Sequence, residues 1–440
     1  MDRLLQHLEH VGDVQIFIAI AAIAFLGFLI MFLRLPPMER LAMSLFGLTV
    51  CQGIGQFQDF GAVATFGKFL AFPALALIIV SCLMIREPGQ TGNPLSFVLI
   101  GAAVWGILCV FVSLDKQLAI PIRLLWLMLV VAAVGLASVA DTPAKAVKIL
   151  SYIFWGMAVI TVIALTSIVV GSGGWTGRLY PYAANPNQIS TVFAFTFIYG
   201  FYRSVTGKNL LESTFFAVVA GLGGIAIILT VSRAAILLAF IPSLPILMRT
   251  SRKPARLIGL VLLLVAMALV MLPKFESHSF GHLFETEGHG RRTAYWMEGV
   301  QQFLESPYVG LLGISNENAI AKDVNPHNAY VSILCLGGLV LAIPYAIAYG
   351  AGLVAAVTVG LKARLRRDDK MLLNVLVLLY VCQLLHGFVN EILFYATFTW
   401  AFVATYLCFF FMNFFLRNLR NANHGYENLP PLRKYPSPIP

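Results

Sequence analysis

Charged residues are scarce in this sequence. Only 11% of its 440 residues are Asp, Glu, Lys or Arg, whereas 59% are hydrophobic. A soluble domain carries about 25% charged residues on average, so a water-soluble globular protein is excluded. The mean hydropathy of +0.84 instead indicates a membrane protein that crosses the bilayer many times. The net charge of +10 does not indicate a nucleic-acid partner, because the basic residues fall mainly in short loops between apolar runs.

The sequence also lacks the motifs of several common functions. Its six cysteines all lie inside apolar runs and form no CxxC pair, so neither disulfides nor a thiolate metal site is predicted. It contains no GxxxxGK(S/T) phosphate loop and no GxSxG turn, so ATP coupling and serine hydrolysis have no support. We expect no cleavable signal peptide, because the first apolar run is long enough to remain a membrane helix.

Apolar runs of roughly 17–25 residues predict about 12–13 transmembrane helices. The expected fold is therefore all-α, a single integral membrane domain over residues 1–440 without internal repeats. The short 40–57 run is one of the weaker patterns; the abutting pair at 214–231 and 232–249 could form two short helices that meet at a membrane face. The helices are expected near 14–34, 40–57, 67–85, 95–113, 119–139, 148–170, 188–202, 214–231, 232–249, 255–272, 329–358, 371–389 and 393–415.

Basic loops set the expected orientation. The segments 249–256 and 362–367 and the tail 416–440 are rich in Lys and Arg, which predicts that all three face the cytoplasm. The long polar loop 273–328 then lies on the opposite side, and its composition agrees, with four Lys or Arg against seven Asp or Glu. The parity of the helix count, and with it the side of the N-terminus, stays open. We expect the Pro-rich end of the tail to be disordered.

The loop 273–328 is the expected carrier of function, because lipid-facing helices cannot bind polar ligands in hydrocarbon. Tyr295, Trp296, Val300 and Phe303 recur at amphipathic spacing, which predicts a helix lying on the membrane surface. The histidines of this loop at 278, 282 and 289 could be read as metal ligands, but no HExxH accompanies them, and we expect no metal.

Arginines in or near the outer part of the chain predict an anion site. Arg233 lies between two apolar runs, where an unpaired Arg deep in the bilayer costs about 2.5–3.5 kcal/mol. A guanidinium matches phosphate oxygens, and an interfacial Arg that reaches lipid headgroups is the alternative. Arg291 and Arg292 form a second cationic pair that suits a diphosphate; the alternative is a solvated pair in the loop.

His327 lies where the polar loop re-enters the membrane. Pro326 restricts the backbone beside it, so the imidazole is held at a helix mouth. With an unperturbed pKa near 6.5, imidazole can take a proton from an alcohol at neutral pH. The alternative is a helix-capping or interfacial histidine. Further polar residues are expected near outer helix ends, although each alone is typical of a topology or packing residue: Lys68, Arg123, Arg178, Asn187, His386, Asn390 and Glu391.

Three features together resemble the superfamily of O-antigen ligases and polymerases, which are glycosyltransferases of the bacterial envelope. They are the Ser232-Arg233 break between two apolar helices, the Gly290-Arg291-x4-Trp296 element of the long loop, and the His327-Asn328 pair followed by Gly337-Gly338. The resemblance covers roughly residues 185–400. No single piece is specific, but the combination is fairly specific.

The resemblance implies a GT-C-like transferase of the bacterial inner membrane whose active site faces the periplasm and needs neither metal nor nucleotide. The implied donor is an undecaprenyl diphosphate-linked glycan, and the acceptor is a sugar hydroxyl of the lipid A–core oligosaccharide. His327 is then the expected general base, and Arg233 with Arg291 or Arg292 the expected diphosphate-binding set. We extend that set by Lys68, Arg123 and Arg178 and expect support from Asn328, Asn187, Tyr330, His386 and Glu391.

The ligase signature of this superfamily is His-Asn, nine residues, Gly, two residues, then Gly, Thr or Tyr. His327-Asn328 and Gly338 match it, but Leu341 occupies the last position. An O-antigen polymerase is therefore the alternative, and a protein O-oligosaccharyltransferase is less favoured because the chain lacks extra soluble sequence. A transporter of lipid-linked glycan is a different class, but the polar groups gather at one face and no paired half-repeats are evident.

Overall fold

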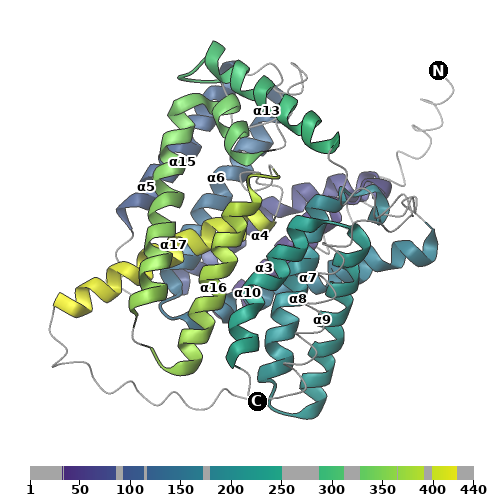
Figure 1. Cartoon of the computed structure of the whole chain (residues 1–440). Helices are drawn as coiled ribbons and strands as arrows, with labels where there is room; N and C mark the ends of the chain where they lie inside the picture. Colours follow the sequence, from purple (N-terminus) through teal and green to yellow (C-terminus); the bar gives the residue numbers. More distant parts are fainter. Residues whose placement is uncertain are drawn as a thin grey trace.

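The computed structural model describes residues 32, 34–85, 93–112, 116–171, 179–249, 287–311, 328–363, 365–390 and 399–423. In these ranges every regular element is a helix, and the strand content is zero. Eight helices of the described ranges are long and apolar enough to cross a membrane. The protein is therefore an all-α, multi-pass membrane protein (Figure 1).

The expected helices agree closely with the observed ones, apart from the spans near 14–34 and 255–272, which fall almost wholly outside the described residues. α3, α8 and α10 form as expected but are too polar or too short to count among the eight. The elements are α3 (Pro37–Ile54), η1 (Gln58–Phe60), α4 (Ala62–Ile85), α5 (Pro94–Leu108), η2 (Cys109–Val112), α6 (Lys116–Val139), α7 (Pro143–Val170), η3 (Pro181–Ala183), α8 (Pro186–Thr206), α9 (Leu210–Thr230), α10 (Arg233–Arg249), α13 (Glu287–Glu305), α15 (Ala329–Lys362), α16 (Arg367–His386) and α17 (Thr399–Asn423).

Local sequence explains where several helices begin. Asn93, Thr142, Asn185 and Asn209 each accept a hydrogen bond from a backbone N–H in the first turn of the helix that follows. Such side chains satisfy N–H groups that have no partner within the helix. Proline occupies the first position of α5, α7 and α8, where its missing N–H costs nothing.

The core of the bundle is α17. Every side chain from Thr399 to Met412 is buried, and the helix packs against α15, α6, α16 and α3. A helix that is apolar all round is typical of a bundle centre. The helix expected near 393–415 continues to Asn423 as α17, and the cytoplasmic tail over 416–440 stays a prediction. Asn413 Nδ2 and Arg417 Nη2 donate to the Ala137 and Ser138 carbonyls at 3.1 and 3.2 Å, which holds this last part of α17 against α6.

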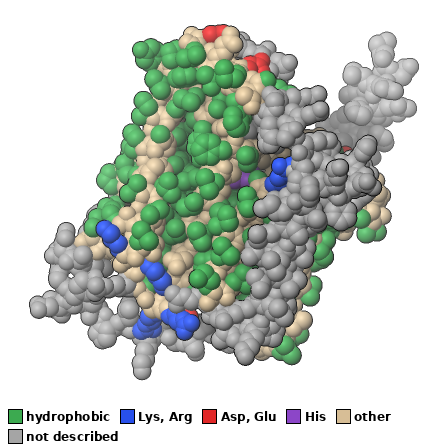
Figure 2. Space-filling model, in the orientation of Figure 1, with side chains coloured by type: hydrophobic (Ala, Val, Ile, Leu, Met, Phe, Trp, Pro, Cys, Tyr) green, Lys and Arg blue, Asp and Glu red, His purple; other side chains and the backbone are tan. Residues whose placement is uncertain are grey.

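Charge separates the two ends of the bundle. Lys362, Arg366 and Arg367 are exposed in the α15–α16 turn, whereas Glu298 and Glu305 are exposed on α13. In Figure 2 most of the Lys and Arg side chains in view gather at the lower end and the acidic ones at the upper end, with hydrophobic side chains between. The two ends of the bundle are joined by α16, which is about 29 Å long at a rise of 1.5 Å per residue. This length is close to the thickness of a hydrocarbon core. Which side of the membrane each end faces stays a prediction from the basic loops.

α15 is folded back on itself, although its sequence was expected to form one helix. Gly338 has φ 57° and ψ −158°, a conformation essentially restricted to glycine. The fold gives a short limb (329–337) and a long limb (339–362). The Tyr330 hydroxyl, at the start of the short limb, donates to the Leu384 carbonyl near the end of α16 at 2.7 Å.

The segment 307–311, which follows α13, satisfies the backbone groups freed at this break. The Leu339 and Val340 N–H groups donate to the Pro307 and Tyr308 carbonyls at 2.9 and 3.0 Å, and the Leu311 N–H donates to the Cys335 carbonyl at 2.9 Å. These three bonds hold α13 at the upper end of α15 (Figure 1). A helix, α13, forms where the loop helix was predicted, and its position on the membrane surface stays a prediction. Its attachment is a main-chain contact that no sequence pattern signalled.

Candidate functional site

The start of α15 is joined to the end of α16. The Asn328 side-chain oxygen accepts from the Tyr330 and Val331 N–H groups at 2.9 and 3.1 Å, and its Nδ2 donates to the Phe388 carbonyl at 3.0 Å. The Ala329 N–H donates to the Gly387 carbonyl at 2.8 Å. We call residues 328–330 and 384–390 the α15–α16 junction. Asn328 fixes the position at which the chain leaves His327, although His327 itself lies outside the described residues.

Aromatic packing strengthens the α15–α16 junction. The Tyr330 ring lies against the Phe388 ring, with centroids 4.6 Å apart, while its hydroxyl is bound to Leu384. Tyr330 is therefore a positioning residue for the first turn of α15. The first turn of α15 is therefore held to the end of α16 by two sets of contacts, one made by Asn328 and one by Tyr330.

The start of α8 reaches the α15–α16 junction from the other side. Asn390 Nδ2 donates to the Asn187 carbonyl at 3.3 Å. Asn187 lies in the first turn of α8, and its N–H donates to the Asn185 side chain at 3.0 Å. The structure therefore brings Asn187, Asn328, Tyr330 and Asn390 together, as expected from the sequence. Glu391 lies outside the described residues.

Arg233 is the first residue of α10 and is half-buried. It follows Val231, whose left-handed backbone (φ 53°) ends α9, and the buried Ser232. The predicted break between the two helices is confirmed, but α9, with 21 residues, is long enough to cross a membrane by itself. The Leu179 N–H donates to the Leu229 carbonyl at 2.8 Å, so the segment before α8 is tied to this break. Arg178, which precedes Leu179 in the chain, lies outside the described residues.

The N-termini of α8, α10 and α15 lie at the same end of the molecule. α10 packs against both α8 and α16, and the starts of α8 and α15 meet at the α15–α16 junction. A helix N-terminus carries roughly half a positive charge and unpaired N–H groups. Such ends favour an anion, above all a phosphate group. The ends of α9 and α16 lie beside these starts, and caps already bind first-turn N–H groups of α8 and α15, so the positive charge at this end comes mainly from Arg233 and Lys68.

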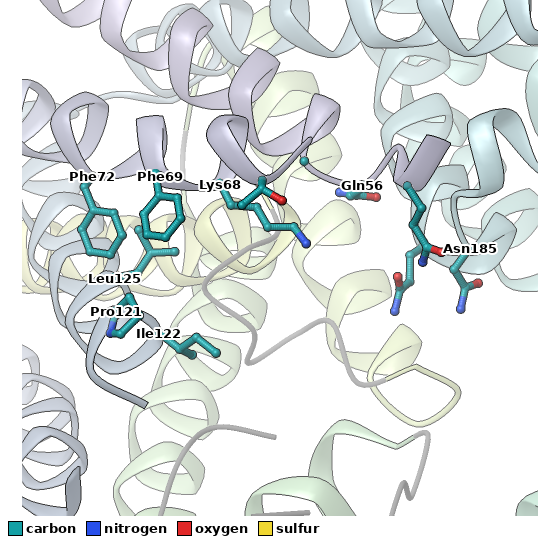
Figure 3. Close-up of a pocket in the computed structure, with 12 residues that line it drawn as sticks. Gln56, Lys68, Phe69, Phe72, Pro121, Ile122, Leu125 and Asn185 are labelled. Atoms are coloured by element: carbon teal, nitrogen blue, oxygen red, sulfur yellow. The ribbon is translucent and has the colours of Figure 1, made fainter. Parts of the chain in front are cut away.

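A cavity of about 430 Å³ opens on the other side of the α8 start. Its wall comes from four places far apart in the sequence: the α3–η1 turn, α4, α6 and the α8 cap. Figure 3 shows the Lys68 amine extending into this space, with Gln56 and Asn185 toward one end and Phe69, Phe72 and Leu125 toward the other. The cavity thus has a polar end that carries a cation and an apolar end.

The polar end of this cavity holds side-chain amides, three of which, the glutamines, were not expected from the sequence. Gln56, Gln58, Asn185 and Gln188 line it, and the buried Oε1 of Gln56 has no hydrogen-bond partner among the described residues. A buried acceptor without a donor is uncommon and costly, and it suits a ligand that carries hydroxyl groups. Amide side chains are common in loops, so their position in the sequence does not indicate a binding site. Only their proximity in the structure does.

Arg123 lies near the cavity but faces elsewhere. Its side chain is fully buried, and Nη1 donates to the Gly106 carbonyl of α5 at 3.0 Å. A buried guanidinium bound to a helix carbonyl stabilises the α5–α6 contact. Its expected part in donor binding stays a prediction.

His386 is buried at the end of α16, and Gln383 lies one turn earlier with a fully buried side chain. Within the described part of the chain neither Oε1 nor Nε2 of Gln383 has a hydrogen-bond partner. An orphaned amide in a membrane bundle is expensive, so Gln383 is a polar point in an otherwise apolar turn of α16. No sequence pattern distinguishes Gln383, because a single Gln in an apolar helix is common.

Two expected residues can be placed only by their backbone. Arg291 and Arg292 lie in α13, but their side chains are outside the described set. His278 and His282, the considered metal ligands, also lie outside it. Among the residues that were described, no cluster of His, Cys, Asp or Glu has the arrangement of a metal site.

No protein-family model matches the sequence, and no curated protein matches it either. The function is therefore argued from the residues alone.

Proposed function

We propose that the protein is a glycosyltransferase that moves a glycan from a lipid diphosphate to a hydroxyl acceptor at the outer face of the membrane. One observation carries the proposal. The starts of α8 and α15 meet, and beside the α8 start lies a cavity that combines the cation of Lys68 and side-chain amides, among them the unpaired Gln56 oxygen, with an apolar end. A lipid-linked glycan has groups that suit these side chains: an anionic diphosphate for Lys68 and sugar hydroxyls for the amides.

The mechanism follows from the residue types. His327 takes the proton from the acceptor hydroxyl as its oxygen attacks the anomeric carbon. The bond between that carbon and the phosphate oxygen breaks, and its electron pair stays on the lipid diphosphate. Arg233, with Arg291 or Arg292, neutralises the charge that develops there, and Lys68 holds the diphosphate beside the α8 start. In-line attack inverts the anomeric configuration.

Within this class we propose the O-antigen ligase reaction, with undecaprenyl diphosphate-linked glycan as donor and lipid A–core as acceptor. The proposal places the protein in the bacterial inner membrane, with a GT-C-like fold of 12–13 spans and the 273–328 loop in the periplasm. The His327-Asn328 pair and Gly338, at the spacing of the ligase signature, support this reaction.

The O-antigen polymerase reaction is the second candidate, because Leu341 departs from the ligase signature. Leu341 is buried, and its side chain occupies the space where a Cβ on Gly337 would lie. The departure therefore alters packing where α15 folds back. It leaves the α15–α16 junction unchanged, so the shared chemistry does not depend on it.

Deletion of the gene in its host tests the two reactions against each other. Loss of a ligase leaves core lipopolysaccharide without O-antigen while lipid-linked polymer accumulates. Loss of a polymerase leaves core capped with single repeats. Normal capping in the deletion strain, or accumulation of polymer on the cytoplasmic side as for a missing transporter, would contradict the proposal.

Replacing Lys68 with Gln is expected to weaken donor binding about 10-fold, since a hydrogen bond to a charged group contributes about 1.5–3 kcal/mol, reduced here because the amine is exposed. The KM for lipid-linked donor should rise while kcat changes little, as measured by steady-state transfer kinetics. Lys145→Gln is the matched control, because Lys145 is paired with Asp141 on the surface. Equal KM values for both variants would show that Lys68 does not bind the donor.

A further inference from the structure

A second hollow, of about 350 Å³, lies where α15 folds back. The short limb contributes Tyr330 and Ile333 to its wall, the long limb Ala346, Gly350 and Leu353, and α16 Leu384. We call it the α15 groove. It exists because Gly338 turns the short limb back, so that residues far apart along one helix face each other.

The floor of the α15 groove is one stripe of the long limb. Positions 342, 346, 350 and 353 recur at intervals of three and four and so lie on one side of a helix. The stripe extends about 16 Å at 1.5 Å per residue. Alanine and glycine along it leave the space that larger side chains would fill; a Cβ added at Gly350 meets nothing within 4 Å.

The α15 groove offers almost no polar chemistry. The Tyr330 hydroxyl is bound to Leu384, and the Tyr349 hydroxyl is 2.8 Å from that of Thr405. Tyr345 adds a buried hydroxyl on a ring that stacks on Trp126, and the rest of the wall is aliphatic. A diphosphate or a sugar would lose its hydration here without replacement, so only hydrocarbon fits.

The groove lies next to the lipid-facing side of the same helix. Ile343, Ile347 and Val354, which alternate with the floor positions, are 51%, 46% and 65% exposed. A membrane helix that exposes such side chains faces acyl chains. A hydrocarbon chain can therefore pass from the bilayer into the groove without crossing water.

The α15 groove is continuous with the candidate site, since Tyr330 and Leu384 belong both to its wall and to the α15–α16 junction. We propose that the groove holds the polyisoprenoid chain of the lipid-linked donor and so sets its diphosphate beside the α15 start. This inference rests on the proposed function, because it names the part of the protein that recognises the donor's lipid.

Gly350→Trp tests the proposal by filling the groove. With a donor that carries the full undecaprenyl chain, the transfer rate at limiting donor should fall at least about 10-fold. With a donor shortened to two isoprene units, the variant and the wild type should transfer alike. Gly101→Trp on α5 is the matched control, because a Cβ there also meets nothing within 4 Å. Equal rates for both variants with the full-length donor would overturn the inference.

Photocrosslinking keeps this test separate from the proposed function. Undecaprenyl phosphate with a diazirine in its chain, added to the wild-type protein in nanodiscs, should label the peptide that contains Tyr330–Leu353. Gly350→Trp should lose most of that label and Gly101→Trp should keep it. Labelling that is unaffected by Gly350→Trp would overturn the proposal that the α15 groove binds the polyisoprenoid chain, whether or not the protein transfers glycan. A wild-type protein that is labelled but inactive would overturn the proposed function alone.

Discussion

Replacing His327 with Ala is expected to reduce glycan transfer by about 10²–10⁴-fold, because a positioned general base contributes this much to a proton-transfer step. Binding of the donor should change little, since the proposed diphosphate contacts come from arginines and Lys68. The two effects can be separated by measuring the single-turnover rate of transfer and the affinity for lipid diphosphate on the same purified protein.

His424→Ala is the matched control for this prediction. His424 directly follows α17, whose last part packs against the end of α6, and the sequence predicts that it faces the cytoplasm. The His424→Ala variant should transfer glycan at the wild-type rate. If His327→Ala retains more than about a tenth of the wild-type rate, another group is the base.

Gly338→Ala is expected to destabilise the protein by about 2–5 kcal/mol, because two penalties add. The backbone of Gly338 lies in a region that only glycine adopts readily (φ 57°, ψ −158°). A Cβ at this position would also lie 2.5 Å from the Tyr308 carbonyl carbon and oxygen, which belong to the segment that holds α13. The measurement is thermal unfolding in detergent, followed by size-exclusion chromatography of the heated sample.

Two further variants make the Gly338 prediction specific. Gly310→Ala should destabilise the protein in the same way, because Gly310 has φ 56° and its Cβ would lie 2.4 Å from the Cys335 oxygen. Gly101→Ala should be neutral or stabilising by up to about 1 kcal/mol, since that helical glycine has open space around it. A Gly338→Ala protein as stable as Gly101→Ala would mean that α15 does not fold back at this residue.

Most of the helical architecture could be predicted from the sequence, since its signals are local. Long apolar runs set the helices, and the polar residues at 230–233 correctly indicated the break between α9 and α10. The fold-back of α15 was missed for a non-local reason. A glycine inside an apolar run is tolerated in membrane helices, and only the main-chain bonds from 307–311 make the break stable.

The candidate site was predicted in part. The sequence placed Lys68, Asn187, Asn328, Tyr330 and Arg233 near one end of the bundle, and the structure agrees. It could not show that the guanidinium of Arg123 is bound to a helix carbonyl, because that depends on how closely α5 and α6 pack. Gln56 and Gln383 were missed because an amide becomes informative only when it is buried without a partner. The role of every one of these residues, and of His327, Arg178 and Glu391, stays a prediction.

The central claim is that cationic side chains, rather than a metal or a nucleotide, activate a lipid diphosphate for glycan transfer. The most direct test is transfer by the purified wild-type protein in liposomes, with undecaprenyl diphosphate-linked glycan, lipid A–core acceptor and EDTA, and without nucleotides. The account predicts glycosylated acceptor with an inverted anomeric linkage, resolved by gel and NMR. Absence of product under these conditions, with product restored only by a divalent metal or ATP, would contradict it.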